Sequence, residues 1–242
     1  MRGETGKIYG EGEQTESNVK VGLKGQSPRD YEIALSAYEV LTSANDKSPT
    51  LCFDHGKKPV VTKMSGDTLV GYCETRKFKS GNYTHGRTRV DWARFTVDGV
   101  YHIAGQKVPT VFTFFRAYSD TTYKGKPYKA GHGFISGKNI TTFTIPFPYG
   151  PLPPMPGVSF QTKGGKFYMP FAYPKPLPIV PAHPDNHWAR FHWKVGEAFR
   201  WKEKKHHNFK DKKWDVSVIS SMSEDVLRHG VLGYNVTSSV DK

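Results

Sequence analysis

TVFTFFRAY (residues 110–118) and NITTFTIPF (residues 139–147) are the two strongest strand signals in the chain. β-Branched and aromatic residues recur along both, and such residues fit a pleated, half-buried surface better than a helix. Phe112, Phe114 and Phe115 place aromatic rings on both faces of the first strand. The sequence therefore predicts two buried strands of one antiparallel sandwich, with one aromatic face in the core. The other face is predicted to lie under a loop or a neighbouring subunit.

The segments that follow each strand are rich in residues that interrupt regular structure. Residues 119–138, dense in Gly and Lys, predict a turn-rich connection. Beyond the second strand, 12 of the 17 prolines fall between Pro146 and Pro184. Proline has no N–H to donate, so this region is predicted to form stiff loops, extended and partly polyproline-like over residues 171–184.

Several shorter patterns also predict strands and turns. Residues 158–161 and 166–169 flank Lys163-Gly164-Gly165 and predict a hairpin. Residues 95–103 predict a strand, a tight turn at Asp98-Gly99 and a second strand, because Asp-Gly suits hairpin turns. Two further strands are predicted at residues 188–193 and 214–222.

One helix is predicted in the first half of the chain. Ser27 is a candidate N-cap and Pro28 suits the first helical position. The apolar residues that follow repeat at helical spacing and form one stripe: Tyr31, Ala34, Leu35, Tyr38 and Leu41.

Composition indicates one large domain with a bias towards anionic partners. The 242 residues suffice for a sizeable core, and no internal repeat or domain boundary is apparent. Residues 1–27 have few apolar side chains and predict an extended N-terminal arm, leaving residues 28–242 as a single domain. The balance of 35 Lys+Arg against 22 Asp+Glu gives +13. Nucleic acid, acidic glycans or acidic protein faces would complement this charge, and a basic surface that serves only solubility is the alternative.

Membrane insertion and redox chemistry receive no support from the sequence. No run approaches the roughly 18 apolar residues of a membrane span, and the first residues contain no apolar signal core. Cys52 and Cys73 match no zinc pattern and are expected as separate buried thiols, which favours a reducing, intracellular origin.

Two basic segments are candidates for contact with RNA or another anion. Residues 76–94 interleave basic and aromatic side chains, a combination that can grip single-stranded nucleic acid by charge and stacking. An exposed basic hairpin whose aromatics face inward is the alternative. Residues 194–213 form a second basic stretch, expected to be solvated. The candidate RNA- or anion-binding residues are Arg76, Lys77, Arg87, Arg89, Lys204 and Lys205.

A histidine cluster is the only candidate metal site. His183, His187 and His192, with Asp185, fall within ten residues. On an extended chain, however, His183 and His187 are too far apart for one ion unless the backbone bends, so surface histidines are the favoured interpretation. Standard nucleotide-binding, hydrolase and metalloprotease motifs do not occur. We therefore expect no enzyme activity, no catalytic residue, no metal and no cofactor.

The order of these features resembles the capsid proteins of picornaviruses and picorna-like RNA viruses. Residues 112–116 match that family's aromatic strand ending in arginine, and residues 144–149 match its strand ending in Ile/Val-Pro-Phe/Tyr. Residues 216–232 match its closing strand loosely. The chain departs from the family pattern in the basic residues 194–213 and the proline-rich residues 170–184.

This resemblance implies an all-β, eight-stranded antiparallel jelly-roll sandwich with long Pro/Gly-rich loops, most like the VP1 type of coat protein. It implies a structural subunit that assembles with other capsid proteins, encloses genomic RNA and presents loops to a host receptor. Location in the virion, and in the host cytoplasm during assembly, would follow, without stable membrane insertion. The alternative function is a jelly-roll metal- or glycan-binding module or enzyme that uses His183, His187 and His192.

Overall fold

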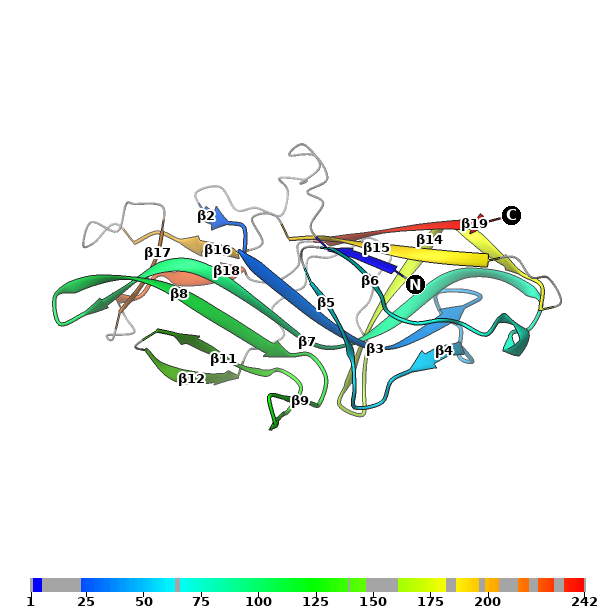
Figure 1. The fold of residues 1–242 in the computed structure, drawn as a ribbon, viewed down its shortest axis with the longest axis horizontal. Helices are drawn as coiled ribbons and strands as arrows, with labels where there is room; N and C mark the ends of the chain where they lie inside the picture. The colour runs from blue at the N-terminus through cyan, green and yellow to red at the C-terminus, as the bar shows by residue number, and fades with distance from the viewer. Residues whose placement is uncertain are drawn as a thin grey trace.

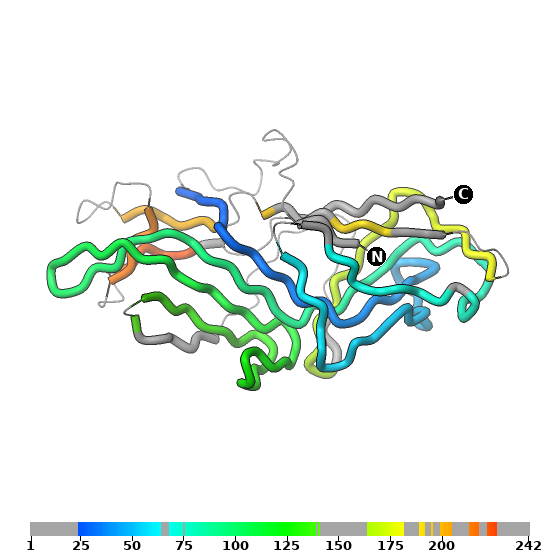
Figure 2. The backbone as a smooth tube through the Cα atoms, in the orientation of Figure 1, coloured from blue at the N-terminus to red at the C-terminus, as the bar shows by residue number. Residues whose placement is uncertain are grey.

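A computed structural model describes residues 2–5, 23–63, 66–138, 140–146, 161–181, 186–195, 199–204, 213–217, 222–228 and 233–241. Within these residues the regular structure is β-strand, apart from the 3-10 turn η2 (Thr75–Lys77) and Met222, which also has 3-10 geometry. The expected all-β class is confirmed. Almost every strand pairing is antiparallel, and the largest sheet curls along its length (Figures 1 and 2).

One layer of the fold is a ten-stranded sheet with the central order β12-β11-β8-β7-β14-β13. β7 is the longest strand, at 23 residues, and it pairs with β3, β8, β14 and β17. The strands of this sheet are β3 (Asp30–Leu41), β4 (Thr50–Asp54), β5 (Val60–Lys63), β7 (Gly81–Ile103), β8 (Gln106–Ala117), β11 (His132–Gly137), β12 (Ile140–Pro146), β13 (Gln161–Lys163), β14 (Lys166–Ile179) and β17 (Trp214–Ser217).

Two smaller sheets form the second layer, one over each half of the large sheet (Figure 1). The first has the order β19-β15-β1-β6 and the second β18-β16-β2. Their strands are β1 (Arg2–Thr5), β6 (Gly66–Leu69), β15 (Asn186–Lys194) and β19 (Gly233–Asp241) in the first, and β2 (Leu23–Gln26), β16 (Phe199–Lys202) and β18 (Asp225–Arg228) in the second. Both strands contributed by residues 1–27, β1 and β2, therefore pair with strands of their own chain.

Aromatic rings from both layers meet in one continuous core. Over one half, Phe199 of β16 packs 5.1 Å from Phe114 of β8, measured between ring centroids. Over the other half, Phe191 of β15 packs edge-on against Phe171 of β14 at 4.5 Å. Burial of such large rings is the main favourable term in folding, and it joins the layers into a sandwich.

The aromatic strand of residues 110–118 is confirmed, with rings on both faces. Phe112 and Phe114 of β8 face the main core, and Phe115, which is fully buried, faces the opposite side. A two-stranded hairpin, β9 (Thr121–Tyr123) with β10 (Lys126–Tyr128), covers Phe115, and Tyr123 stacks on it at 4.3 Å. The covering segment is thus a loop of the same chain. The second predicted strand is β12, whose side chains from 141 onward lie outside the described residues, as do Asn139 and Phe147.

The helix predicted after Ser27 is wrong, because these residues form the strand β3. Tyr31, Ile33 and Leu35 alternate towards the core, and Tyr38 and Val40 resume the alternation after a shift. The shift is a bulge in the pairing with β7 between Leu35 and Ala37. The extra residue at the bulge makes the spacing between the core-facing residues Leu35 and Tyr38 three instead of two. The strand is also buried on its other face, so apolar residues such as Ala34 and Leu41 stand next to the core-facing ones. Together these two features give the sequence the spacing of an apolar helical stripe.

The tight turn predicted at Asp98-Gly99 is also wrong, since β7 continues through both residues. The chain reverses later, at Ala104 and Gly105, which have φ values of 49° and 75°. Gly99 instead allows β17 to lie close, because a Cβ there would stand 2.5 Å from the carbonyl oxygen of Trp214. Residues 119–138 likewise contain more regular structure than a connection, namely β9, β10 and β11.

Other predictions in the second half of the chain are mostly confirmed. Gly164 and Gly165, both with positive φ, form the turn between β13 and β14. β15 covers the strand predicted at 188–193, and β17 covers the start of the strand predicted at 214–222. The proline-rich residues from 171 to 179 are extended as predicted, but the expected loop is wrong there, because β14 continues through them and pairs with β7 as far as Ile179. The expectation that residues 194–213 are solvated fails at β16, where Phe199 and Trp201 are fully buried.

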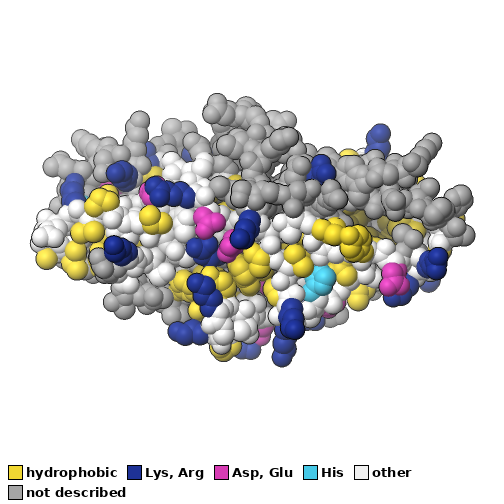
Figure 3. All heavy atoms as spheres, viewed as in Figure 1, with side chains coloured by type: hydrophobic (Ala, Val, Ile, Leu, Met, Phe, Trp, Pro, Cys, Tyr) yellow, Lys and Arg dark blue, Asp and Glu magenta, His cyan; other side chains and the backbone are white. Residues whose placement is uncertain are grey.

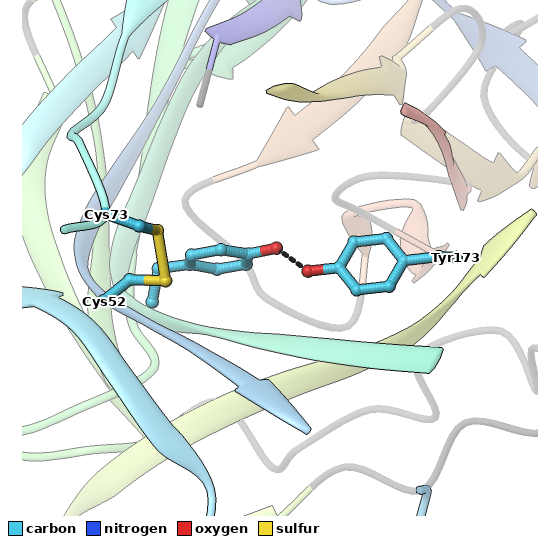
Figure 4. The surroundings of a disulfide bond; sticks show 4 residues. Cys52, Cys73 and Tyr173 are labelled. Atoms are coloured by element: carbon cyan, nitrogen blue, oxygen red, sulfur yellow. Dashed lines mark hydrogen bonds between the residues drawn. A yellow bond between two sulfur atoms is a disulfide. The ribbon is translucent and has the colours of Figure 1, made fainter. Parts of the chain in front are cut away.

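The two cysteines are not separate thiols. Cys52 of β4 and Cys73, which follows β6, form a disulfide with their Cα atoms 4.4 Å apart (Figure 4). Beside it, the buried hydroxyls of Tyr38 and Tyr173 hydrogen-bond to each other (Figure 4). Burial raises the pKa of both phenols, so both stay protonated and can share this bond.

Among the described residues, no helix has the length and hydrophobicity that crossing a membrane requires.

Candidate functional site: a charged pocket around Arg89

Arg89 is a buried cation at the centre of the long strand β7. It is 4% exposed, and two carboxylates and a hydroxyl surround its guanidinium. The Nη1 and Nη2 atoms donate to the two carboxylate oxygens of Asp54 at 3.1 and 2.8 Å. The Nε atom donates to the Ser36 hydroxyl at 2.6 Å and lies 3.5 Å from Asp91 Oδ1. This fork geometry fixes both the arginine and its acids, because a planar guanidinium pairs best with a carboxylate that meets both of its arms.

Asp91, two residues further along β7, is the second buried charge. Its Oδ1 accepts a hydrogen bond from Ser36 at 2.7 Å, and the residue is only 5% exposed. Burial raises the pKa of this carboxyl, and the bonds to Ser36 and Arg89 oppose the rise. Desolvation therefore dominates at Asp91, which makes its ionised form costly unless a further donor or cation approaches.

A pocket of about 570 Å³ opens next to this pair of charges. Its size falls within the roughly 300–1,000 Å³ of ordinary ligand pockets. Arg89 and Asp91 contribute from β7, and the turn after β4, the β9–β10 hairpin and the first residue of β14 supply the other walls. These elements are distant in sequence, and β7 brings them together because it pairs with β14, with β3, which carries β4, and with β8, which leads into the β9–β10 hairpin.

The rim of the pocket is also charged. The Lys129 ammonium lies 2.8 Å from the Asp120 carboxylate, and together with the Ala130 amide it lowers the pKa of Asp120. Lys57 and Lys166 line the same opening and are exposed. A chemically mixed site results, with Arg89 and Asp91 buried at depth and Lys57, Lys129, Lys166 and Asp120 at the mouth.

The predicted RNA- or anion-binding residues do not form one surface. Arg89 is buried in the network above, and Arg87, half-buried on the same strand, is paired with Glu39. Arg76 and Lys77 lie exposed in and around η2, where Lys77 pairs with Glu74 at 2.8 Å. Lys204 follows β16, with its ammonium 4.0 Å from Asp225, and Lys205 lies outside the described residues.

The histidine cluster is not assembled by the described backbone. His187 and His192 lie on the unbroken strand β15, opposite Val240 and Asn235 of β19, and five residues of strand span about 16 Å. Their side chains, and His183 altogether, lie outside the described residues. Within the part of the chain that the structure describes, no three His, Cys, Asp or Glu side chains are grouped to hold a metal ion.

A second buried acid lies at the far end of the core. Glu224 is 2% exposed and accepts hydrogen bonds from the backbone amides of Asp215, at 2.8 Å, and Lys204, at 3.3 Å. Burial raises its pKa to about 7, and the nearby Asp215 carboxylate adds to the rise. Asp215 is buried as well, and it contacts His102 of β7. Glu224 therefore holds β17 and the end of β16 together through a group that titrates near neutral pH.

Sequence reasoning missed the acids of the pocket. Asp54 lies in no motif that the sequence analysis singles out, Asp120 lies in the predicted connection of residues 119–138, and Asp91 lies beside Trp92 in the basic residues 76–94. No spacing links them, since they meet only through strand pairing. The one available signal was a charged residue, Asp91, within a stretch of strong β-formers.

No protein family model matches the chain, and neither the curated proteins nor the solved structures contain a significant match to it.

Proposed function

We propose that the protein is a structural subunit of an icosahedral viral shell, with a jelly-roll sandwich as its framework. It would assemble with copies of itself and with other coat proteins, enclose RNA and present loops to a host receptor. An eight-stranded jelly roll of the VP1 type is the finer architecture that this proposal assigns to the sandwich.

The observation that supports the proposal most is the placement of the two sequence stretches that resemble coat proteins. Residues 112–116 lie on β8 and residues 144–146 lie on β12. Both strands pair antiparallel with β11, so the two stretches belong to one sheet of a two-layer β fold. Stiff two-layer β domains suit shell building, because paired sheets leave loops and edges free for contacts between subunits.

The surface charge supports the part of the proposal that concerns RNA. Lys and Arg side chains are spread over the face shown in Figure 3, where fewer Asp and Glu are visible. The formal charge of the chain is +13. Cations distributed in this way interact with a polyanion by releasing its counterions, without requiring a sequence-specific site.

Particle size is the decisive measurement. The purified protein, alone and co-expressed with candidate coat partners, would be examined by light scattering after gel filtration and by electron microscopy. We expect closed particles of megadalton mass. A monomer or small oligomer under every condition, with its fold intact by circular dichroism, would rule out the shell function.

RNA enclosure has its own readout. Particles would be treated with ribonuclease before the RNA is extracted, with free RNA as a control. Protected RNA is expected, and binding of single-stranded RNA to free subunits should weaken steeply with salt. Particles without RNA, together with RNA binding that does not depend on salt, would contradict RNA enclosure. The positive charge would then serve contacts other than those with RNA.

A further inference from the structure

The pocket around Arg89 offers a hydrogen-bond acceptor at its floor. Asp91 lines the pocket and is 5% exposed, and its Oδ1 atom is engaged by Ser36 and Arg89. For the other oxygen, Oδ2, no hydrogen bond exists among the described residues. Oδ2 is not one of the enclosed side-chain atoms that lack a partner, so it is accessible from the pocket, and this open acceptor suits a ligand that brings a donor.

The rim favours a negative charge. Lys57 and Lys166 both line the opening, and neither forms an ion pair within the described part of the chain. The other charged pair of the rim, Asp120 and Lys129, is internally neutral. Lys166 helps to lower the pKa of the Asp54 carboxyl, but that carboxylate is already paired with Arg89. The opening therefore keeps an excess of positive charge, which attracts an anion and opposes a cationic ligand.

The remaining wall is amphipathic. Tyr128 and Pro127 of β10 line it with apolar surface, and Thr121 and Thr122 of β9 add hydroxyl groups. Tyr128 is itself held in place, since its ring packs 4.8 Å from the buried Phe115. A fixed aromatic ring next to hydroxyls fits a ligand with an apolar face and polar edges.

We propose that this pocket binds a sugar that carries one anionic group, a carboxylate or a sulfate. A ring hydroxyl would donate to Asp91 Oδ2, the anionic group would lie between Lys57 and Lys166, and the C–H face of the ring would pack on Tyr128. All of these groups belong to one chain, so the site goes beyond the proposed shell function and does not depend on assembly.

Binding would be measured on the isolated chain by titration calorimetry and ligand-detected NMR. The probes are glucuronic acid and glucose 6-sulfate, with glucose, sodium sulfate and glycine as comparisons. Both acidic sugars should bind at least about tenfold more tightly than glucose or sulfate alone, and their affinity should fall with salt. Equal affinity for glucose and the acidic sugars would overturn the proposal. So would preferential binding of glycine, or sulfate binding as tight as that of the acidic sugars.

Variants separate the rim from the floor. Lys57→Ala and Lys166→Ala should each weaken the binding of glucuronic acid about three- to fivefold without changing the weaker binding of glucose. Asp91→Asn replaces the charged acceptor at the floor with a neutral amide, and should weaken the binding of glucuronic acid and of glucose by a similar factor while thermal unfolding verifies the fold. Lys107→Ala, on the exposed β7–β8 end of the sheet, is the matched control and should have no effect. Unchanged glucuronic acid affinity in both rim variants would place the ligand elsewhere, whatever the fate of the Asp91 variant.

Discussion

Gly99 lies directly against Trp214: a Cβ on the glycine would stand 2.5 Å from the tryptophan carbonyl oxygen and 2.7 Å from the Phe112 ring. The contact belongs to the parallel pairing of β17 with β7, one of the few parallel ladders in the fold. A methyl group at this position must push β17 or the ring away. We predict that Gly99→Ala lowers the free energy of unfolding by about 1–3 kcal/mol, measured by urea denaturation.

Gly81 provides the matched control for this substitution. It begins the same strand, and a Cβ there would have no heavy atom within 4 Å. Gly81→Ala should change stability by no more than about 1 kcal/mol, in the stabilising direction, because alanine restricts the unfolded chain. Equal losses in the two variants would show that the close approach of β17 is not what requires glycine at 99.

Phe115 tests the second aromatic face of β8. The ring is fully buried between Trp92 and the β9–β10 hairpin, with Phe134 stacked at 5.1 Å. Truncation to alanine removes these contacts and leaves a cavity. Phe115→Ala should therefore cost about 3–5 kcal/mol of unfolding free energy.

A thermal or urea unfolding series would compare this variant with Val111→Ala on the same strand. Val111 is 42% exposed, so its truncation should cost about 0.5 kcal/mol or less. A small loss at Phe115 would mean that the hairpin is only loosely attached. The hairpin itself would then be a flexible cover over the sheet.

What the sequence could predict depended on whether the signal was local. β8, β12 and the turn at Gly164-Gly165 follow from side-chain types and from the freedom of glycine at positive φ, and all three are found. β3 was misread because a bulge, which its partner β7 defines, shifts the apolar spacing. Asp98-Gly99 was misread because the glycine accommodates a strand that begins more than a hundred residues later.

The candidate site could not be predicted from local sequence patterns either, because strand pairing brings together residues that are distant in sequence. The network around Arg89 joins Ser36, Asp54 and Asp91, and its partners come from three different strands or their intervening turns. Interleaved basic and aromatic residues at 76–94 left two interpretations open, a contact with RNA or an exposed basic hairpin whose aromatics face inward. Pairing turned the basic side chains towards acids of neighbouring strands, which only the register of the sheet reveals.

The disulfide should contribute measurably to stability. Cys52 and Cys73 are 21 residues apart, and cross-linking a loop of this length removes chain entropy worth about 3 kcal/mol from the unfolded state. The double variant Cys52→Ser/Cys73→Ser should lose about that much unfolding free energy. Adding a reductant should destabilise the natural chain similarly and leave the double variant unchanged. An identical unfolding midpoint with and without reductant in the natural chain would contradict the pairing.

Glu224 should make stability depend on pH between about 4.5 and 7. Its pKa is about 7 in the folded protein, against 4.5 for an unperturbed glutamate, so in this window the folded state holds a proton that the unfolded state has released. A raised carboxyl pKa means that stability falls as pH rises through the window. At about 1.4 kcal/mol for each pKa unit, the loss reaches at most about 3.5 kcal/mol. Carboxyls with lowered pKa values, such as Asp46 and Asp120, act in the opposite direction, but at lower pH.

Glu224→Gln isolates this contribution, because glutamine cannot ionise. Glutamine has a single carbonyl oxygen, so it keeps an acceptor for only one of the two backbone amides, and the variant should be less stable than the natural chain when both are uncharged. Urea denaturation at pH 5 and pH 7.5 should show that the natural chain loses more stability than the variant between the two values. The pKa of Asp91 is also raised, so the unfolding free energy of both proteins still falls somewhat as pH rises. Asp225→Asn changes an exposed neighbour, and this variant should lose as much unfolding free energy between the two pH values as the natural chain does. If the glutamine variant and the natural chain gave the same slope, Glu224 would be ionised in the folded protein, and its two backbone hydrogen bonds would outweigh the cost of burying its charge.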